Sequence, residues 1–144
     1  MYTAVIIGVD IGGTRTKYGL VNIETGEVIE SIVQPTEKKN AVAFLQQVTM
    51  VINECKNIAS EKGLVLSGIG FGIPGFTTQQ GVVLTTYGAL TFMENYPLKA
   101  LVEKEFDLTC LMDNDASIVC LGEALYSICG CTPIANIISL CVAP

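Results

Sequence analysis

The sequence predicts an α/β fold with a mixed sheet that opens with an antiparallel meander of three strands and is flanked by helices. Two observations carry this prediction. Three apolar, β-branched runs come first and are separated only by short, glycine-containing turns. Apolar runs then alternate with stretches in which apolar residues recur every three or four positions, which is the helical period.

The opening strands are expected at residues 3–10, 16–23 and 28–33, with turns at residues 12–13 and 25–26. Each turn contains glycine, which permits the tight reversals that antiparallel neighbours need. The three strands are therefore expected to pair in chain order.

A long helix is expected next, with Asn40 as its N-cap and Gly63 as its end. Asparagine side chains cap helix amides, and glycine accepts the left-handed backbone that follows a last turn. Residues 64–72 then form a buried strand, and residues 82–86 form a short one. From residue 40 onward, the sequence therefore predicts helices that alternate with strands in place of the meander.

The last third of the chain continues that alternation. Pro97 is expected in the first turn of a helix that reaches Phe106, because proline fits where no amide is needed. A strand at residues 108–112, a helix at 116–128 and an apolar strand at 134–142 follow. Open α/β sheets of this kind bind ligands at the carboxyl ends of their strands.

Composition excludes several classes of partner. Half of the residues are hydrophobic, 15% are charged, and the net charge is −6. An acidic chain has no general electrostatic attraction to nucleic acid or to an anionic membrane, and no apolar run reaches the ~18 residues of a membrane span. We therefore expect no nucleic-acid or membrane partner, and an apolar surface that another domain or subunit covers.

The chain has no histidine and six cysteines. The absence of histidine excludes a Ser-His-Asp triad and any histidine-ligated metal within this chain. No secretory signal precedes the first strand, so we expect a cytoplasmic protein with reduced thiols that serve mainly as small core residues. Cys129-Gly130-Cys131 lacks a second ligand pair and is not expected to bind metal.

The first candidate site is the turn between the first two strands. Glycines there let the backbone bring its N–H groups close to an anion, and a threonine hydroxyl adds a donor. A carboxylate at the strand end could hold Mg²⁺ directly or through water. The alternative is an ordinary capped hairpin turn. The candidate phosphate-site residues are Asp10, Gly12, Gly13, Thr14, and Arg15 or Lys17.

The second candidate site is the glycine-rich segment at residues 68–75. It contains G-x-G-x-x-G, but that dinucleotide fingerprint must open a helix, and residues 76–81 have no helical period. The Pro74-Gly75 loop after a buried strand suits close backbone approach to a small ligand. A turn required only for packing is the alternative.

The third candidate site is Asp113-Asn114-Asp115, between a strand and a helix. A carboxylate there lies where α/β sheets bind ligands, and the helix amides favour its ionised form. Such an aspartate could accept a proton from a substrate hydroxyl. The alternative is an ordinary N-cap, although a cap alone needs only one such residue.

In order and spacing, these three segments resemble the ROK family of bacterial sugar kinases and repressors, on the side of its glucokinases and N-acetylhexosamine kinases. The first is similar to the family's phosphate motif and the second to its sugar-side loop. The third, continued by Gly122-Glu123-Ala124, is similar to the segment with the catalytic aspartate. The resemblance covers residues 1–130. It implies the ribonuclease H-like or actin-like ATPase fold, with sugar and ATP bound between two lobes.

The resemblance also implies roles. Asp115 would be the general base, and Pro74, Gly75 and Asn114 would contact the sugar. The ATP phosphates would lie beside a larger set, with Asp10 also the candidate ligand of Mg²⁺: Asp10, Gly12, Gly13, Thr14 and Lys17. Two positions depart from the family pattern, because Ala89 and Ser117 stand where asparagine is usual.

We expect residues 1–114 to be the N-terminal small lobe and residues 115–144 to be the start of a C-terminal lobe that is cut short. The full-length protein would be an ATP-dependent hexose or amino-sugar kinase and a homodimer, and the fragment would be inactive alone. The family's zinc motif is not expected in this chain. One alternative is the sugar-sensing domain of a ROK-type repressor, for which no winged helix precedes the first strand. The other is a non-catalytic sugar-binding module.

Overall fold

The computed structural model of the chain describes residues 2–122. Its main sheet has five strands in the order β3-β2-β1-β4-β7. The strands β1 (Ala4–Ile11), β2 (Arg15–Asn22) and β3 (Val28–Pro35) form an antiparallel meander, and β4 (Val65–Ile73) and β7 (Cys110–Asn114) run parallel to β1. The predicted mixed sheet with an antiparallel opening is confirmed.

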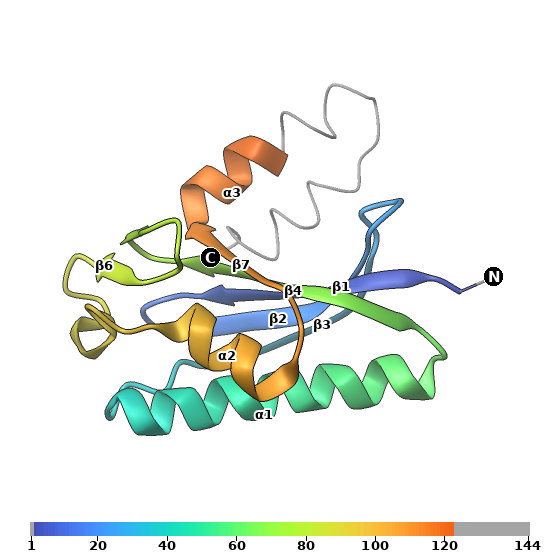
Figure 1. Ribbon diagram of the computed structural model, residues 1–144, viewed down its shortest axis with the longest axis horizontal. Helices are drawn as coiled ribbons and strands as arrows, with labels where there is room; N and C mark the ends of the chain where they lie inside the picture. Colours follow the sequence, from blue (N-terminus) through green and yellow to red (C-terminus); the bar gives the residue numbers. More distant parts are fainter. Residues whose placement is uncertain (1, 123–144) are drawn as a thin grey trace.

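Helices lie on both faces of this sheet. Figure 1 shows α1 (Ala41–Glu61) and α2 (Leu98–Phe106) on one face and α3 (Asp115–Gly122) on the other. In the part of the chain that the structure describes, no helix is long and apolar enough to cross a membrane.

The predicted ends of the long helix α1 are confirmed. The Asn40 side chain accepts a hydrogen bond from the Ala43 amide at 2.9 Å, which is N-cap geometry. Gly63 follows the C-cap with φ +66°, the left-handed conformation that glycine adopts without a steric penalty. The local sequence signals at both ends were therefore sufficient.

Short elements differ from the prediction. The strand expected at residues 82–86 is β6 (Val83–Thr85), which pairs with β5 (Phe76–Thr77) in a separate two-stranded sheet, and a 3-10 helix η1 spans Thr91–Met93. Neither β5 nor η1 was predicted, because two or three residues cannot display a period. Pro97 is the N-cap of α2 and so lies just before the helix.

The third helix begins at Asp115, one residue earlier than predicted. Three predictions lie outside the described residues: the continuation of this helix to 128 with Glu123 and Ala124, the strand at 134–142, and the Cys129-Gly130-Cys131 segment. The lobe boundary between residues 114 and 115 stays a prediction.

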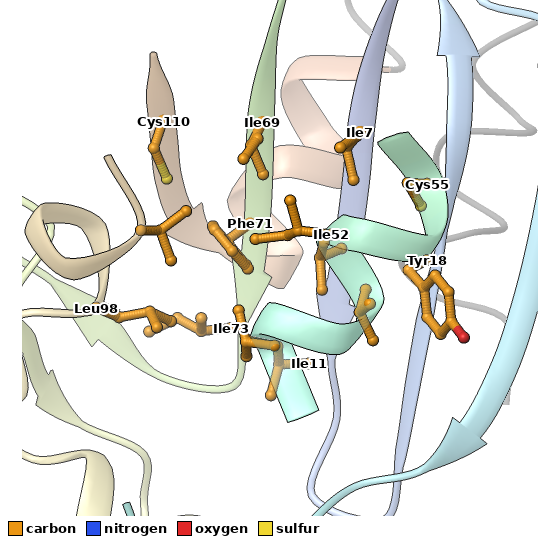
Figure 2. Packing of buried hydrophobic residues seen from close by; sticks show 14 of the residues in the cluster. Ile7, Ile11, Tyr18, Ile52, Cys55, Ile69, Phe71, Ile73, Leu98 and Cys110 are labelled. Carbon is orange, nitrogen blue, oxygen red and sulfur yellow. The ribbon is translucent and has the colours of Figure 1, made fainter. Parts of the chain in front are cut away.

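The core lies between the sheet and α1. Figure 2 shows that side chains of the strands, including Ile7, Phe71 and Tyr18, lie on the face of the sheet that α1 covers with Ile52. The hydroxyl of Tyr18 donates a hydrogen bond to Glu54 at 2.7 Å and so ties β2 to the helix. Alternation sends one face of each strand into this core and leaves the other face for a different use.

Two cysteines contribute to the core as expected. Cys55 and Cys110 are buried free thiols. Burial raises the pKa of each thiol to about 12. Both are therefore protonated at neutral pH and act as small apolar groups.

Candidate functional site

The face of the sheet opposite α1 carries a row of polar and glycine residues where β1 ends. Asp10 pairs in register with Lys17 of β2 and with Gly72 of β4. Paired residues of neighbouring strands point to the same face. The side chain of Asp10 therefore lies between a lysine and a position without a side chain, and it is 8% exposed.

Asp115 comes close to this row from α3. A methyl group placed on Gly72 would lie 3.6 Å from Oδ1 of Asp10, 3.7 Å from Cα of Asp115 and 3.6 Å from Cδ1 of Ile118. Glycine at position 72 thus keeps open the space between the Asp10 carboxylate and the beginning of α3. The first and third candidate segments therefore meet at the carboxyl ends of the parallel strands β1, β4 and β7.

The electrostatics of Asp10 reflect this crowding. Burial, and secondarily the negative charge of Asp115, raise the pKa of Asp10 from 3.8 to about 7, against the lowering effect of Lys17. A carboxylate in this setting is stabilised by a proton or a cation.

The residues present fit a magnesium ion that arrives with a phosphate ligand. Mg²⁺ is usually held in proteins by one or two carboxylates, and it fills its remaining positions with water and substrate phosphate oxygens. Asp10 supplies such a carboxylate. Within residues 2–122, no group of three or more His, Cys, Asp or Glu residues could hold a metal, so the described chain offers no resident metal cage.

The β1–β2 turn is closed by its own backbone. The Gly12 amide donates to the Arg15 carbonyl at 2.9 Å, and a Cβ on Gly12 would lie only 2.6 Å from that oxygen. Gly13 faces the loop before η1, since its Cβ would lie 3.4 Å from the methyl group of Ala89. Thr14 is exposed at the tip. The predicted phosphate residues are therefore gathered around one turn.

Asn114 joins the second and third candidate segments. Its Nδ2 donates to the Gly75 carbonyl at 2.6 Å, while its Oδ1 accepts from the amides of Ala116 at 3.0 Å and Ser117 at 3.2 Å. Asn114 thus performs the capping role considered above for Asp115. One residue is thus enough for the cap, as expected, and that residue is Asn114, while Oδ1 of Asp115 accepts a hydrogen bond from the Ala116 amide at 2.8 Å.

The Pro74-Gly75 loop is fixed from two sides. Gly75 is buried with φ +137°, and a Cβ there would overlap the backbone of Thr85 in β6. Pro74 is half-buried beside it. With its carbonyl held by Asn114, this loop lies next to the start of α3, where Asp115 is found.

Sequence reasoning missed two threonines beneath the β1–β2 turn. The hydroxyls of Thr16 and Thr36 are 2.9 Å apart, and Thr36 also donates to the Gly12 carbonyl at 2.8 Å. Thr16 falls on a core-facing position of its strand, where a polar residue is a signal worth following. Thr36 lies just after β3, and no local pattern marks it.

A mixed sheet of this order, with a glycine turn after the first strand and an aspartate where the last parallel strand enters a helix, defines a lobe of the actin-like ATPase fold. The sequence profile of the ROK family matches residues 6–132. The chain belongs to this family.

Similar proteins include both kinases and repressors. The chain is 31% identical over 119 residues to a glucokinase of Halalkalibacterium halodurans, with 81% of this chain and 35% of that protein covered. It is 30% identical over 126 residues to a putative xylose repressor of a Caldicellulosiruptor species, with 84% and 30% covered. The chain spans about a third of the length of these relatives.

Solved structures show the same fold. The ROK family glucokinase of Streptomyces griseus, determined in complex with glucose and AMPPNP, aligns with a TM-score of 0.70 at 26% identity. The alignment covers 83% of this chain and 36% of that one. The ribonuclease H-like or actin-like fold expected from the resemblance is confirmed.

Proposed function

We propose that this chain is the N-terminal part of an ATP-dependent kinase that transfers the γ-phosphoryl group to a hydroxyl of a hexose or amino sugar. Family membership and the glucokinase relatives support a sugar kinase. The observation that carries the proposal is the approach of Asp10 and Asp115 to one another across Gly72. We also propose that the protein is cytoplasmic, where ATP is available as the phosphoryl donor. The homodimer stays a prediction.

In this proposal Asp115 accepts the proton of the sugar hydroxyl. The oxygen then forms a bond to the γ-phosphorus, and the bond from that phosphorus to the bridging oxygen breaks, so that ADP leaves with the electron pair. Phosphoryl transfer needs mainly alignment and charge neutralisation. Asp115 starts α3, whose position the Asn114 cap holds, so the base would be aligned by a rigid element.

The phosphates would lie at the β1–β2 turn. Gly12, Gly13 and Thr14 supply backbone and hydroxyl donors there, and Lys17 adds a positive charge next to Asp10. Asp10 would hold Mg²⁺ directly or through water, and the ion would neutralise phosphate charge.

The sugar would lie beside Asn114 and the Pro74-Gly75 loop. Asn114 has two N–H donors on its amide nitrogen, and only one of them is needed for the bond to Gly75. The second is available to a sugar hydroxyl. Ala89 brings a methyl group to Gly13 where many family members have asparagine, so this chain would recognise its sugar with a smaller set of polar groups.

The test is a kinase assay on the full-length protein with Asp115→Asn. A positioned base contributes roughly 10²- to 10⁴-fold, so kcat should fall by that factor while the KM for sugar changes little. Asp107→Asn is the matched control, since Asp107 is exposed with φ 51° and asparagine accepts that conformation. An Asp115→Asn enzyme with normal kcat would exclude Asp115 as the base.

The 144-residue chain alone is expected to release no ADP in response to sugar. It spans about a third of the length of its kinase relatives, and the rest of the cleft would come from the remainder of the protein. Sugar-dependent turnover by this chain would contradict that expectation.

A sugar sensor without catalysis is the second candidate, favoured by the similarity to a xylose repressor. The two candidates differ in one measurement. A sensor would bind sugar, seen as a shift in melting temperature, and would show no ADP release with any sugar that binds.

A further inference from the structure

Two buried hydroxyls lie under the turn that the proposed function assigns to phosphate. Thr16 is 3% exposed and Thr36 is 7% exposed. Burying a hydroxyl is unfavourable unless it is hydrogen-bonded, and these two bond to each other and to the turn. Thr36 comes from the segment after β3, a remote part of the sequence.

The direction of these hydrogen bonds follows from the donors available. A hydroxyl has one hydrogen, and Thr36 donates its own to the Gly12 carbonyl at 2.8 Å, since a carbonyl can only accept. In the 2.9 Å contact between the hydroxyls, Thr16 must therefore be the donor. The result is a relay from Thr16 to Thr36 to the oxygen of Gly12.

The relay determines the orientation of one peptide plane. In a trans peptide the C=O of one residue and the N–H of the next point in opposite directions, and the described chain contains no cis peptide. Because Thr36 holds the Gly12 oxygen on its own side, the Gly13 N–H points away from Thr36. Within residues 2–122, that amide donates no hydrogen bond.

The backbone of Thr36 fixes a second point of the turn. Its amide donates to the Thr14 carbonyl at 2.9 Å. One residue thus holds the turn on both sides of Gly13, at the carbonyls of Gly12 and Thr14. The backbone bond continues the β2–β3 ladder beyond the pair Arg15 and Pro35. The side-chain bond from Thr36 to the Gly12 carbonyl is additional to that ladder and to the Gly12–Arg15 bond that closes the turn.

We infer that Thr36, supported by Thr16, is a positioning residue that aims the Gly13 N–H at the terminal phosphates of the nucleotide. The inference rests on the proposed function, in which this turn binds the phosphate donor. Thr36 affects the binding of the nucleotide and not of the sugar. Its hydrogen bonds are with the turn and with Thr16, and not with the Asn114–Gly75 segment.

The first test uses the 144-residue chain and magnesium tripolyphosphate as the probe, with the ¹⁵N shift of the Gly13 amide as the readout. The wild-type chain should show a saturable shift. Thr36→Val keeps the side-chain shape and removes the donor, so its Kd should rise about tenfold, which corresponds to one good hydrogen bond. Thr36→Ser keeps the hydroxyl and should stay within about threefold of wild type.

If Thr36→Val does not fold, Thr36→Cys provides the second comparison. A thiol is a weak donor of similar size, so the Kd of Thr36→Cys should be higher than those of the wild-type and Thr36→Ser proteins. Equal Kd values for wild type, serine and the weak or absent donors would overturn the inference.

The second test uses the full-length protein and separates an effect on ATP binding from an effect on sugar binding. Thr36→Val should raise the KM for ATP about tenfold and leave the KM for sugar within about twofold. Equal rises in both constants would indicate a general structural role and refute the inference. A wild-type protein that neither binds tripolyphosphate nor turns over ATP would instead refute the proposed function, and the inference with it.

Discussion

At the scale of single residues, Asp10 is a carboxyl group placed where its charge is unfavourable. Its carboxyl is buried, faces a second carboxylate and has one lysine in the neighbouring strand. Because its pKa is about 7 in the folded chain and ordinarily 3.8, the protonated carboxyl stabilises the fold below pH 3.8. That contribution is lost as the pH rises through about 7.

Asp10→Asn should therefore stabilise the chain at pH 8. The wild-type carboxyl is ionised at this pH although it is buried, whereas the asparagine amide carries no charge. The free energy of unfolding should therefore rise by on the order of 1–2 kcal/mol after solvent screening. Urea unfolding at pH 5 and pH 8 in the presence of EDTA measures it. The variant should lose less stability than wild type between these pH values, whereas Asp107→Asn should follow wild type. A variant that is less stable than wild type at pH 8 would contradict the account.

Asn114→Ala should lower the free energy of unfolding by on the order of 1–3 kcal/mol, because it removes the cap of α3 and the bond to Gly75. Asn114→Asp keeps an accepting oxygen and loses the donor, so its loss should be smaller. Chemical denaturation checks both. Asn53→Ala, at an exposed position of α1, is the control and should be near neutral. Equal free energies of unfolding for the two alanine variants would mean that the hydrogen bonds of Asn114 do not stabilise the fold.

At the scale of elements, the strands of the main sheet, the helices and the two turns of the meander were predictable, whereas the short elements β5 and η1 were not. The N-cap Asn40 and the stop at Gly63 act on neighbouring atoms, so a local pattern contains the information. The hydrogen bond from Thr36 to Gly12 joins residues 24 positions apart. No local pattern predicts it, because it depends on how the meander pairs.

The candidate site divides in the same way. Asp10 and Asp115 could be selected as candidates from the sequence because each ends or begins an element, where ligands of α/β sheets bind. The gap at Gly72 and the double role of Asn114 were not found. Both depend on the register between β4, β7 and α3, and register is a property of the assembled sheet.

Two glycines test how an element is joined to its neighbours. Gly75→Ala combines an unfavourable φ of +137° with overlap of the Thr85 backbone, so it should cost on the order of 3 kcal/mol or more. Gly63→Ala has φ +66° and nothing within 4 Å, so strain alone applies and about 1 kcal/mol is expected. Thermal unfolding of both variants measures the difference. Equal losses would show that the Gly75 loop can move away from β6.

At the scale of the whole molecule, stability and candidate chemistry use opposite faces of one sheet. The face towards α1 is apolar and buried, whereas Asp10, Lys17 and Gly72 occupy the other face. Alternation along the strands makes this separation possible. Changes in the core should therefore affect folding more than the geometry of the site.

Ile52→Ala is the corresponding test. Ile52 is fully buried on α1, and truncation should cost about 2–5 kcal/mol. Met50→Ala, at a position 71% exposed on the same helix, should cost less than about 0.5 kcal/mol. Below the unfolding transition, the Gly13 amide of Ile52→Ala should respond to tripolyphosphate as in wild type. A large change in that response would show that core and site are coupled.

The amide of Asn114 has a consequence for any change of specificity. One planar group bonds to the Pro74-Gly75 loop through its nitrogen and to the first turn of α3 through its oxygen. If this loop binds sugar as proposed, a substitution that moved Gly75 to admit a bulkier sugar would also move the Asn114 amide and, with it, Asp115. Selectivity and turnover would then change together, so directed evolution of this loop would have to select for both at once.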